Sequence, residues 1–265
     1  MNELLISEIN SDEKALLEKI VLIEEFIFNS SNTCLDSLES IIEQCDQSMA
    51  GITDPLIQVE EVINELYVGQ LFIDKNRDFW PISAFILQKS LEYRLISPIL
   101  KAIIAHHVIE ECGFDVDLVF VPEKIMIRIV CDDNYVIIFD PVTGESLNWQ
   151  ELDSRMDDID DPTQDELINV SMQSLIIKHL TALKGEFIRE QHFDQALKCV
   201  DILLALSPDD PFERRDRGFL LHQLDCFKVA VDDYRYFVEQ CPKDPAAQLL
   251  KIQLDNINMT NTVIH

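Results

Sequence analysis

Two histidines and two glutamates near the middle of the chain have a spacing that metal ligands can use. His106 and Glu110 are four residues apart, as are His107 and Glu111, so each pair would lie on one face of a helix. A structural or catalytic zinc ion needs at least a third ligand and ordered groups around its ligands. The neighbouring sequence supplies no third ligand. We therefore interpret the segment as an ordinary helix end, and we expect neither a metal nor another cofactor.

The cysteines are a second possible source of chemistry. The chain has seven of them, an odd number, with no C-x-x-C pair, which is typical of reduced thiols in a cytoplasmic protein. Cys112 falls at the end of an expected helix, where the helix dipole disfavours a thiolate. Cys131 is followed directly by Asp132 and Asp133. We predict that neither Cys112 nor Cys131 is a nucleophile.

The C-terminal part of the chain repeats itself at a period of 34 residues. Phe193 is matched by Phe227, and Ala196 by Ala230. A small residue where two helices cross, an apolar i, i+3, i+4 stripe and a terminating proline are the pattern of the tetratricopeptide helix-turn-helix. We predict a domain over residues 162–265 with helices at 165–190, 193–206, 210–224, 227–240 and 245–257.

The residues before this domain, 1–161, indicate a second, mixed domain. Apolar spacing predicts helical segments over 4–72 and helices over 82–95 and 98–112, followed by three antiparallel strands near 116–120, 124–130 and 135–139. Between Glu151 and Glu166, eight of sixteen residues are acidic, too polar to fold alone. We interpret this stretch as a joint, with the domain boundary near residue 162. The predicted class is α+β, mostly α.

The composition limits the classes of partner. Forty-nine Asp and Glu against 21 Lys and Arg give a net charge of −28, which opposes non-specific binding to nucleic acid and to anionic membranes. The sequence has no run of eighteen apolar residues that could span a bilayer. We expect a cytoplasmic protein whose partner is a protein or peptide.

Several motifs resemble one bacterial family. They are Arg94-Leu-Ile-Ser-Pro-Ile99, Phe120-Val-Pro-Glu-Lys-Ile-Met-Ile-Arg128, Phe139-Asp-Pro-Val-Thr-Gly-Glu-Ser-Leu147 and Asp209-Asp-Pro-Phe-Glu-Arg-Arg-Asp-Arg-Gly218. Together they resemble the SirB family, in its YchA-like branch, over roughly residues 60–265. The resemblance implies a transglutaminase-like domain followed by a tetratricopeptide domain.

The same resemblance implies positions for a catalytic triad. Transglutaminase-like enzymes use a cysteine at a helix N-terminus, then a histidine and an aspartate on successive strands. Asp140 fits the third position, but Lys124 stands at the histidine position and residues 96–100 contain no thiol. We therefore predict a pseudoenzyme. An alternative is a residual hydrolase or acyltransferase in which Lys124 activates Ser97, although a serine before Pro98 is also a typical helix cap, which we favour.

The repeat pattern indicates a binding groove lined by the first helix of each repeat. Its groove-facing positions correspond here to Lys178, Arg189, Arg215, His222 and Gln223. Cationic and polar side chains could hold a carboxylate or an acidic peptide, so the leading prediction is a non-catalytic adaptor. The alternative is that these charges form ion pairs inside the molecule. Arg214 and Arg217, at positions where the repeat pattern prefers large apolar residues, would then reach acidic groups of the first domain or the joint.

Overall fold

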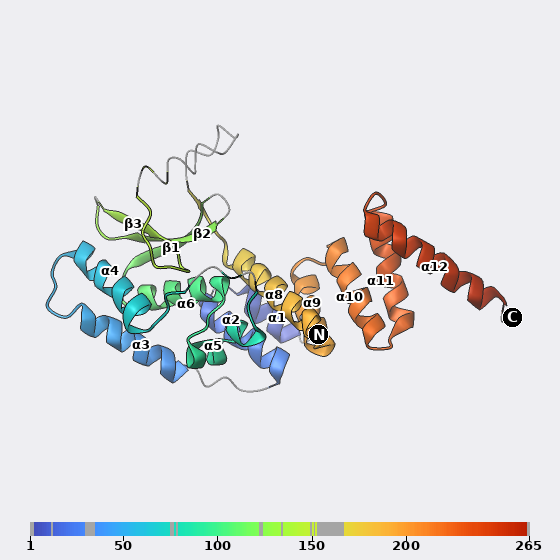
Figure 1. Cartoon of the computed structure of the whole chain (residues 1–265), viewed down its shortest axis with the longest axis horizontal. Helices are drawn as coiled ribbons and strands as arrows, with labels where there is room; N and C mark the ends of the chain where they lie inside the picture. Colours follow the sequence, from blue (N-terminus) through green and yellow to red (C-terminus); the bar gives the residue numbers. More distant parts are fainter. Residues whose placement is uncertain are drawn as a thin grey trace. The chain divides into compact units, whose positions relative to one another are not determined.

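The structure is a computed structural model, and it confirms the predicted α+β, mostly helical class (Figure 1). It describes residues 3–11, 13–29, 35–74, 77, 79–121, 124–133, 135–148, 150, 152 and 167–263. The chain forms two compact units. The sheet unit comprises Ser11–Glu25 and Asn29–His179, and the repeat unit comprises Met1–Asn10, Phe26–Phe28 and Leu180–His265.

The sheet unit contains α-helices together with a π-helix and a 3-10 helix. They are α2 (Leu16–Phe28, whose last turn belongs to the repeat unit), α3 (Leu35–Ser48), α4 (Pro55–Asn64), the π-helix η1 (Glu65–Gly69), the 3-10 helix η2 (Ile82–Phe85), α5 (Leu87–Tyr93) and α6 (Pro98–Glu111). Asp54 caps α4 by accepting a hydrogen bond from the Leu56 N–H at 3.0 Å, and Pro55 occupies the first helical position.

The prediction of one helix over 82–95 is wrong. Ile86 is extended and separates η2 from α5. The Leu87 N–H, at the start of α5, donates to the buried Glu24 carboxylate of α2 at 2.6 Å. A carboxylate at a helix N-terminus satisfies a free N–H and complements the dipole. The break therefore depends on a residue 63 positions earlier in the chain.

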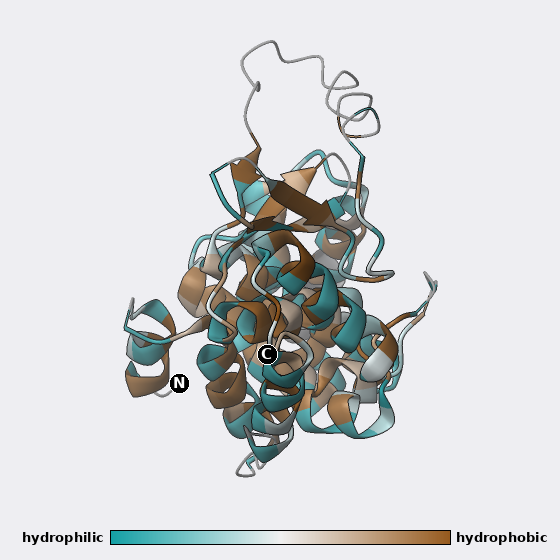
Figure 2. Ribbon diagram, turned by 90° about the vertical axis from the view of Figure 1, so that its left-hand side faces the viewer, coloured by the Kyte–Doolittle hydropathy of each residue, from teal (hydrophilic) through white to brown (hydrophobic). Residues whose placement is uncertain are grey.

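The sheet is antiparallel, with the order β3-β2-β1-β4. Its strands are β1 (Asp115–Val121), β2 (Lys124–Val130), β3 (Val136–Phe139) and β4 (Ile168–Asn169). The first three match the predicted strands. Helix α6 packs on β1 and β2, and it is buried along almost its whole length. Figure 2 shows the strands largely in brown, the colour of hydrophobic residues, as expected for strands that form a core.

The predicted helix over 165–190 starts too early. Residues of β4 pair with β1, Ile168 opposite Phe120 and Asn169 opposite Val119, and helix α8 (Met172–Arg189) begins only afterwards. The Ser171 hydroxyl accepts a hydrogen bond from the Ser174 N–H at 3.2 Å, which is the bond of a helix N-cap. The acidic joint and the predicted boundary at residue 162 lie, apart from Leu152, outside the described residues.

The repeat unit contains the helices that the 34-residue period predicts. It comprises α1 (Glu3–Asn10), the second half of α8, α9 (Phe193–Leu206), α10 (Pro211–Gln223), α11 (Phe227–Gln240) and α12 (Pro245–Val263). Asp210 caps α10 through the Phe212 N–H at 2.8 Å. Helix α1 packs against α9. No helix in the described part of the chain is long and apolar enough to cross a membrane.

Gly218 lies where α10 and α11 cross. A Cβ at this position would come within 2.8 Å of the Tyr234 ring and 3.2 Å of the Ala230 carbonyl oxygen. Both distances are shorter than ordinary van der Waals contacts, so a larger residue here would have to displace the Tyr234 ring. This agrees with the register of the repeat in the sequence, which places Gly218 and Ala230 on facing helices.

Candidate functional site

Lys124 and Asp140 meet beside the sheet. Lys124 begins β2, and Asp140 directly follows β3, the neighbouring strand. Lys124 Nζ lies 3.0 Å from Asp140 Oδ2, and Asp140 Oδ1 accepts a hydrogen bond from the Val142 N–H at 2.7 Å. The lysine side chain is 41% exposed and the aspartate 14%. The second and third triad positions are therefore adjacent, and they form an ion pair.

Ser97, the third member of the alternative triad, has different surroundings. It is fully buried and occupies the N-cap position of α6, and its N–H donates to the Ala84 carbonyl at 2.8 Å. Its hydroxyl has no hydrogen-bond partner among the described residues. The predicted capping bond is therefore not formed, although the position and Pro98 are as expected. No hydrogen bond joins Ser97 to Lys124 in this part of the chain.

Lys101 is a buried cation that the sequence interpretation missed. It lies one turn after Ser97 on α6 and is only 1% exposed. Its Nζ donates to the Phe72 carbonyl at 2.6 Å and lies 3.5 Å from the Val142 carbonyl. Burial lowers the pKa of Lys101 to about 8, partly opposed by the charge of Asp74. A single lysine in the apolar run from Ile99 to Ala105 was the available signal.

The turn that follows Asp140 is held by Tyr67 of η1. The Tyr67 hydroxyl donates to the Pro141 carbonyl at 2.8 Å. Burial, and then the charge of Asp140, raise the pKa of Tyr67 well above its ordinary value, so the phenol stays neutral. Gly144, with φ +76°, fits under the ring, where a Cβ would lie 2.5 Å from Tyr67 Cγ. Lys101 and Tyr67 thus fix the backbone around Asp140.

Cys112, Cys131 and His106 each have a pKa shifted toward the neutral form. A hydrogen bond with Cys45, together with burial, raises the pKa of Cys112, and burial followed by the charge of Asp132 raises the pKa of Cys131. Both shifts oppose thiolate formation. His106 Nδ1 lies 3.8 Å from Glu110 Oε2, and burial lowers the pKa of His106. The described residues contain no group of three His, Cys, Asp or Glu side chains that could hold a metal ion.

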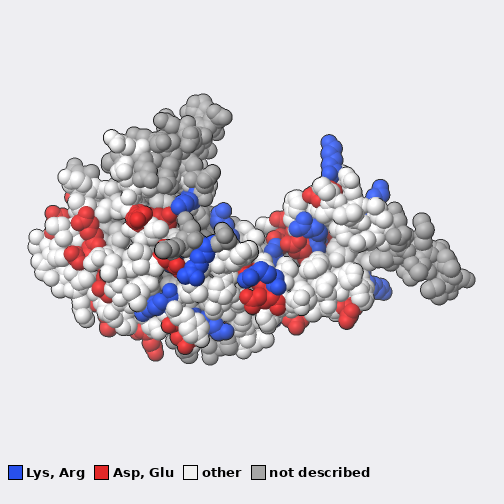
Figure 3. Space-filling view, in the orientation of Figure 1, with Lys and Arg blue, Asp and Glu red and all other residues white. Residues whose placement is uncertain are grey.

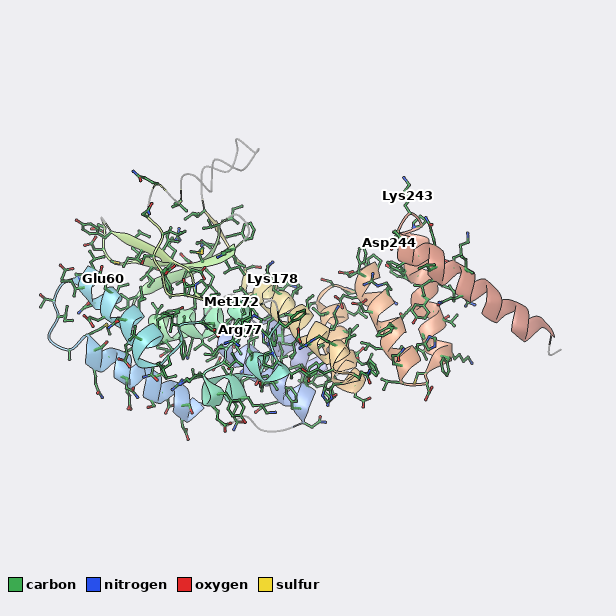
Figure 4. All side chains as sticks on the ribbon, in the orientation of Figure 1. Glu60, Arg77, Met172, Lys178, Lys243 and Asp244 are labelled. Atoms are coloured by element: carbon green, nitrogen blue, oxygen red, sulfur yellow. The ribbon has the colours of Figure 1, made fainter. Side chains whose placement is uncertain are left out.

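The predicted groove residues are divided between the two units. Lys178 is exposed on the half of α8 that belongs to the sheet unit (Figure 4), whereas the other four belong to the repeat unit. Arg189 pairs with its neighbours on α8, Glu186 and Glu190. Arg215 pairs with Asp216, the next residue. Two of the five side chains are therefore engaged locally, as the ion-pair alternative predicts.

His222 and Gln223 lie at the end of α10, where both are exposed. The His222 ring meets Phe227 edge-on with centroids 4.9 Å apart. His222 also lines a groove between α11 and α12 with a volume of about 460 Å³. The structure therefore points to a groove that the sequence did not predict, at which only His222 of the five residues is present.

Two further arginines, each about a third exposed, pair with one buried aspartate. Arg217 Nε and Nη2 donate to the two oxygens of Asp233 at 2.7 and 2.6 Å, and Arg214 Nη1 lies 3.7 Å from the same carboxylate. Asp233 is buried on α11. Arg214 and Arg217 therefore have a partner on the adjacent helix of the same repeat, whereas most of the joint, one of the two partners expected for them, lies outside the described residues.

Comparison with known proteins gives the same order of domains. The model of the transglutaminase-like superfamily matches residues 32–181, and that of the tetratricopeptide repeat matches residues 183–255. UPF0162 protein YchA of Escherichia coli is 30% identical over 240 residues, 89% of each chain. A UPF0162 protein of Vibrio cholerae is 31% identical over 85% of each chain. Protein SirB1 of Salmonella typhimurium is 27% identical over 87% of each.

Proposed function

Because this chain belongs to the family of the UPF0162 and SirB1 proteins, with a transglutaminase-like domain followed by tetratricopeptide repeats, we propose that it is a non-catalytic adaptor that binds another protein through its repeats. The observation that carries the proposal is the Lys124–Asp140 ion pair, 3.0 Å long, at the position where the family pattern expects an imidazole beside a carboxylate. Function follows from the groups in a site and not from the fold that holds it.

The buried groups nearby do not replace the missing triad. A nucleophilic mechanism needs an accessible nucleophile in hydrogen-bond reach of a base. The Ser97 hydroxyl is fully buried and makes no hydrogen bond within the described residues. Lys101 has a lowered pKa, but its Nζ is engaged with a backbone carbonyl at 2.6 Å. These contacts support a structural role for both side chains.

The repeats supply the binding half of the proposal. Arrays of this kind present extended surfaces to other proteins, and an open groove lies between α11 and α12. The net charge of −28 supports a protein partner over nucleic acid or an anionic membrane. The described cysteines are all free, which supports a reducing compartment, and we place the protein in the cytoplasm.

The catalytic alternative is tested with a serine-reactive fluorophosphonate. We expect no labelling of Ser97 in the folded protein, because its hydroxyl is buried and has no hydrogen-bond partner among the residues that the structure describes. Labelling is read by mass spectrometry of the native chain, with Lys124→Met as the matched variant. Labelling of Ser97 that disappears in Lys124→Met would instead establish the hydrolase or acyltransferase built on Ser97, Lys124 and Asp140.

The binding half is tested by affinity capture from a native lysate. Residues 227–254 of the repeats contain four cations, Lys228, Arg235, Lys243 and Lys251. We expect reversal of all four to glutamate to release the captured partner, and Lys124→Met to retain it. The reverse result, with binding lost only in Lys124→Met, would assign the function to the transglutaminase-like domain.

A further inference from the structure

The groove between α11 and α12 has an apolar floor and an aromatic rim. Ala230, Tyr234 and Leu254 are buried along it. Phe227, at the start of α11, lines the groove and is 51% exposed. Its volume of about 460 Å³ is within the range of sites that bury a ligand. A large exposed aromatic beside such a groove is the kind of side chain that anchors a partner.

The register of the repeats indicates which kind of element fits the groove. Pro245 follows Pro211 by 34 residues, so α12 corresponds to α10, the first helix of its repeat. In a stacked array, the second helix of each unit covers the preceding second helix and the first helix of its own unit. The turn of a third repeat would fall at 258–260, but α12 continues without a break to Val263. The groove therefore lies where the second helix of a third repeat would pack. Within the described residues, the chain does not form that helix at the position that the 34-residue period predicts.

The charges around the groove differ from those of the rest of the chain. Lys228 and Arg235 line it, two helical turns apart on α11, and Arg235 makes an exposed ion pair of 3.5 Å with Asp232, which also lines the groove. Over residues 227–254, four Lys and Arg balance four Asp and Glu, in a chain whose net charge is −28. One of the four acids, Asp233, is neutralised internally by Arg217. In Figure 3, blue and red atoms adjoin one another over the repeat helices. The surface here is therefore locally suited to acidic side chains of a partner.

We propose that this groove, between α11 and α12, docks an amphipathic helix of another protein, whose apolar face is flanked by Asp or Glu. The helix takes the place of the second helix of a third repeat. Its apolar face covers Tyr234 and Leu254, and its acidic side chains meet Lys228 and Arg235. This inference rests on the proposed function, for which it names the binding surface and the chemistry of the partner. A second copy of this chain fits less well, because two chains of charge −28 repel each other.

The test is selection from a displayed library of helical peptides of about 20 residues, using the whole chain as bait. We expect the enriched peptides to combine apolar residues at i, i+3, i+4 and i+7 with flanking Asp and Glu. Fluorescence anisotropy then measures the affinity of the best peptide for each variant. Phe227→Asp and the pair Lys228→Glu/Arg235→Glu should each weaken binding by about tenfold or more, and added salt should weaken binding to the wild type.

The repeat unit offers matched controls. Val229→Asp places the same charge on α11 at a residue that is 55% exposed but does not line the groove. Lys243→Glu/Lys251→Glu makes the same change of charge outside the groove, and Lys243 projects from the turn between α11 and α12 (Figure 4). Both controls should bind within about twofold of the wild type. Thermal unfolding of every variant confirms that the repeats remain folded.

Several outcomes would overturn the inference. They are an absence of enriched peptides, enrichment of basic or extended peptides, and equal losses in groove and control variants. A wild-type dimer that dissociates in Phe227→Asp would assign the groove to a second copy. Failure of the groove is distinct from failure of the adaptor function. If Phe227→Asp still captures the lysate partner and the fourfold reversal does not, the adaptor stands and binds elsewhere on the repeats.

Discussion

Each unit contains a buried lysine, and the pKa values of the two lysines are shifted in opposite directions. In the sheet unit, Lys101 donates hydrogen bonds only to backbone carbonyls among the described residues, and burial lowers its pKa to about 8. In the repeat unit, burial also acts to lower the pKa of Lys184, but hydrogen bonds to Asp216 and Glu213 at 2.7–2.8 Å outweigh it and raise that pKa. Burial acts to lower the pKa of both lysines. The carboxylate partners of Lys184 explain why its pKa is raised and its charged form is favoured in the folded unit.

The difference also separates two uses of charge. The repeat unit joins its helices with ion pairs, Lys184 of α8 to α10 and Arg217 of α10 to Asp233 of α11. Burial raises the pKa of Glu213 although its Lys184 partner acts to lower it. The free-energy cost of removing the carboxylate from water is therefore only partly offset by the ion pair. The sheet unit instead uses Lys101 to hold the loop at Phe72 and the turn at Val142. In the sheet unit, the ammonium group of Lys101 thus positions the backbone near Asp140.

Removing the carboxylate of the repeat unit should have the largest effect. Asp233→Ala leaves Arg217 without its bidentate partner in a largely buried crossing, and we expect the free energy of unfolding to fall by about 3 kcal/mol. Urea denaturation of the two proteins measures the difference. The control is Asp232→Ala, one residue earlier, whose side chain is 78% exposed and lies 3.5 Å from the half-exposed Arg235. Loss of this exposed ion pair should change stability by less than about 0.5 kcal/mol, and equal losses in the two variants would remove the distinction between a buried and an exposed ion pair.

The lysine comparison predicts opposite dependences on pH. Between about pH 8 and 10.5, the unfolded state keeps the Lys101 proton while the folded state releases it, so this group makes folding more favourable as pH rises. Across this window, the stability of the wild type should increase by about 2–3 kcal/mol relative to Lys101→Met. Chemical denaturation at several pH values measures this difference, in which groups common to both proteins cancel.

Lys184→Met is the matched control for that experiment. Its raised pKa means that the folded state holds the Lys184 proton more tightly, so its contribution is present below the unfolded pKa and is lost as pH rises through the folded value. The wild type should therefore lose stability relative to Lys184→Met at strongly alkaline pH. If both lysines gave the same sign, the partner would not be the deciding factor.

The sequence predicted what depends on short-range pattern. The period of 34 residues placed α9, α10 and α11 within one residue of their observed bounds, because caps such as Asp210 and Pro211 lie beside the helix that they start. The pairs that engage Arg189 and Arg215 are also local, since Glu186 and Asp216 are three residues and one residue away. Neighbouring charges of this kind could have excluded both arginines as groove residues.

Long-range partners account for what the sequence did not predict. The break before α5 depends on Glu24, and β4 forms because Ile168 meets Phe120. Lys101 was visible as a lone cation in an apolar helix, but the carbonyls that hold it come from two other segments. The local sequence predicts that the Ser97 hydroxyl caps α6. In the structure this hydroxyl makes no capping hydrogen bond, and nothing in the neighbouring residues indicates that.

The smallest predicted effects test whether the repeat unit also depends on close fit where its helices cross. Gly218→Ala adds a Cβ within 2.8 Å of Tyr234, and we expect a loss of about 1–2 kcal/mol despite the better helix propensity of alanine. Gly185→Ala on α8 meets nothing within 4 Å, so propensity alone should stabilise it by about 0.5–1 kcal/mol. Thermal and urea unfolding compare the two variants.

Changes of opposite sign in the free energy of unfolding would locate the need for a small residue at the α10–α11 crossing. Because Tyr234 also lines the groove, Gly218→Ala should also weaken binding of the docked helix. An increase in the free energy of unfolding of both variants would mean that the α10–α11 crossing accommodates the added methyl group. Ion pairs rather than close packing would then determine how these helices stack.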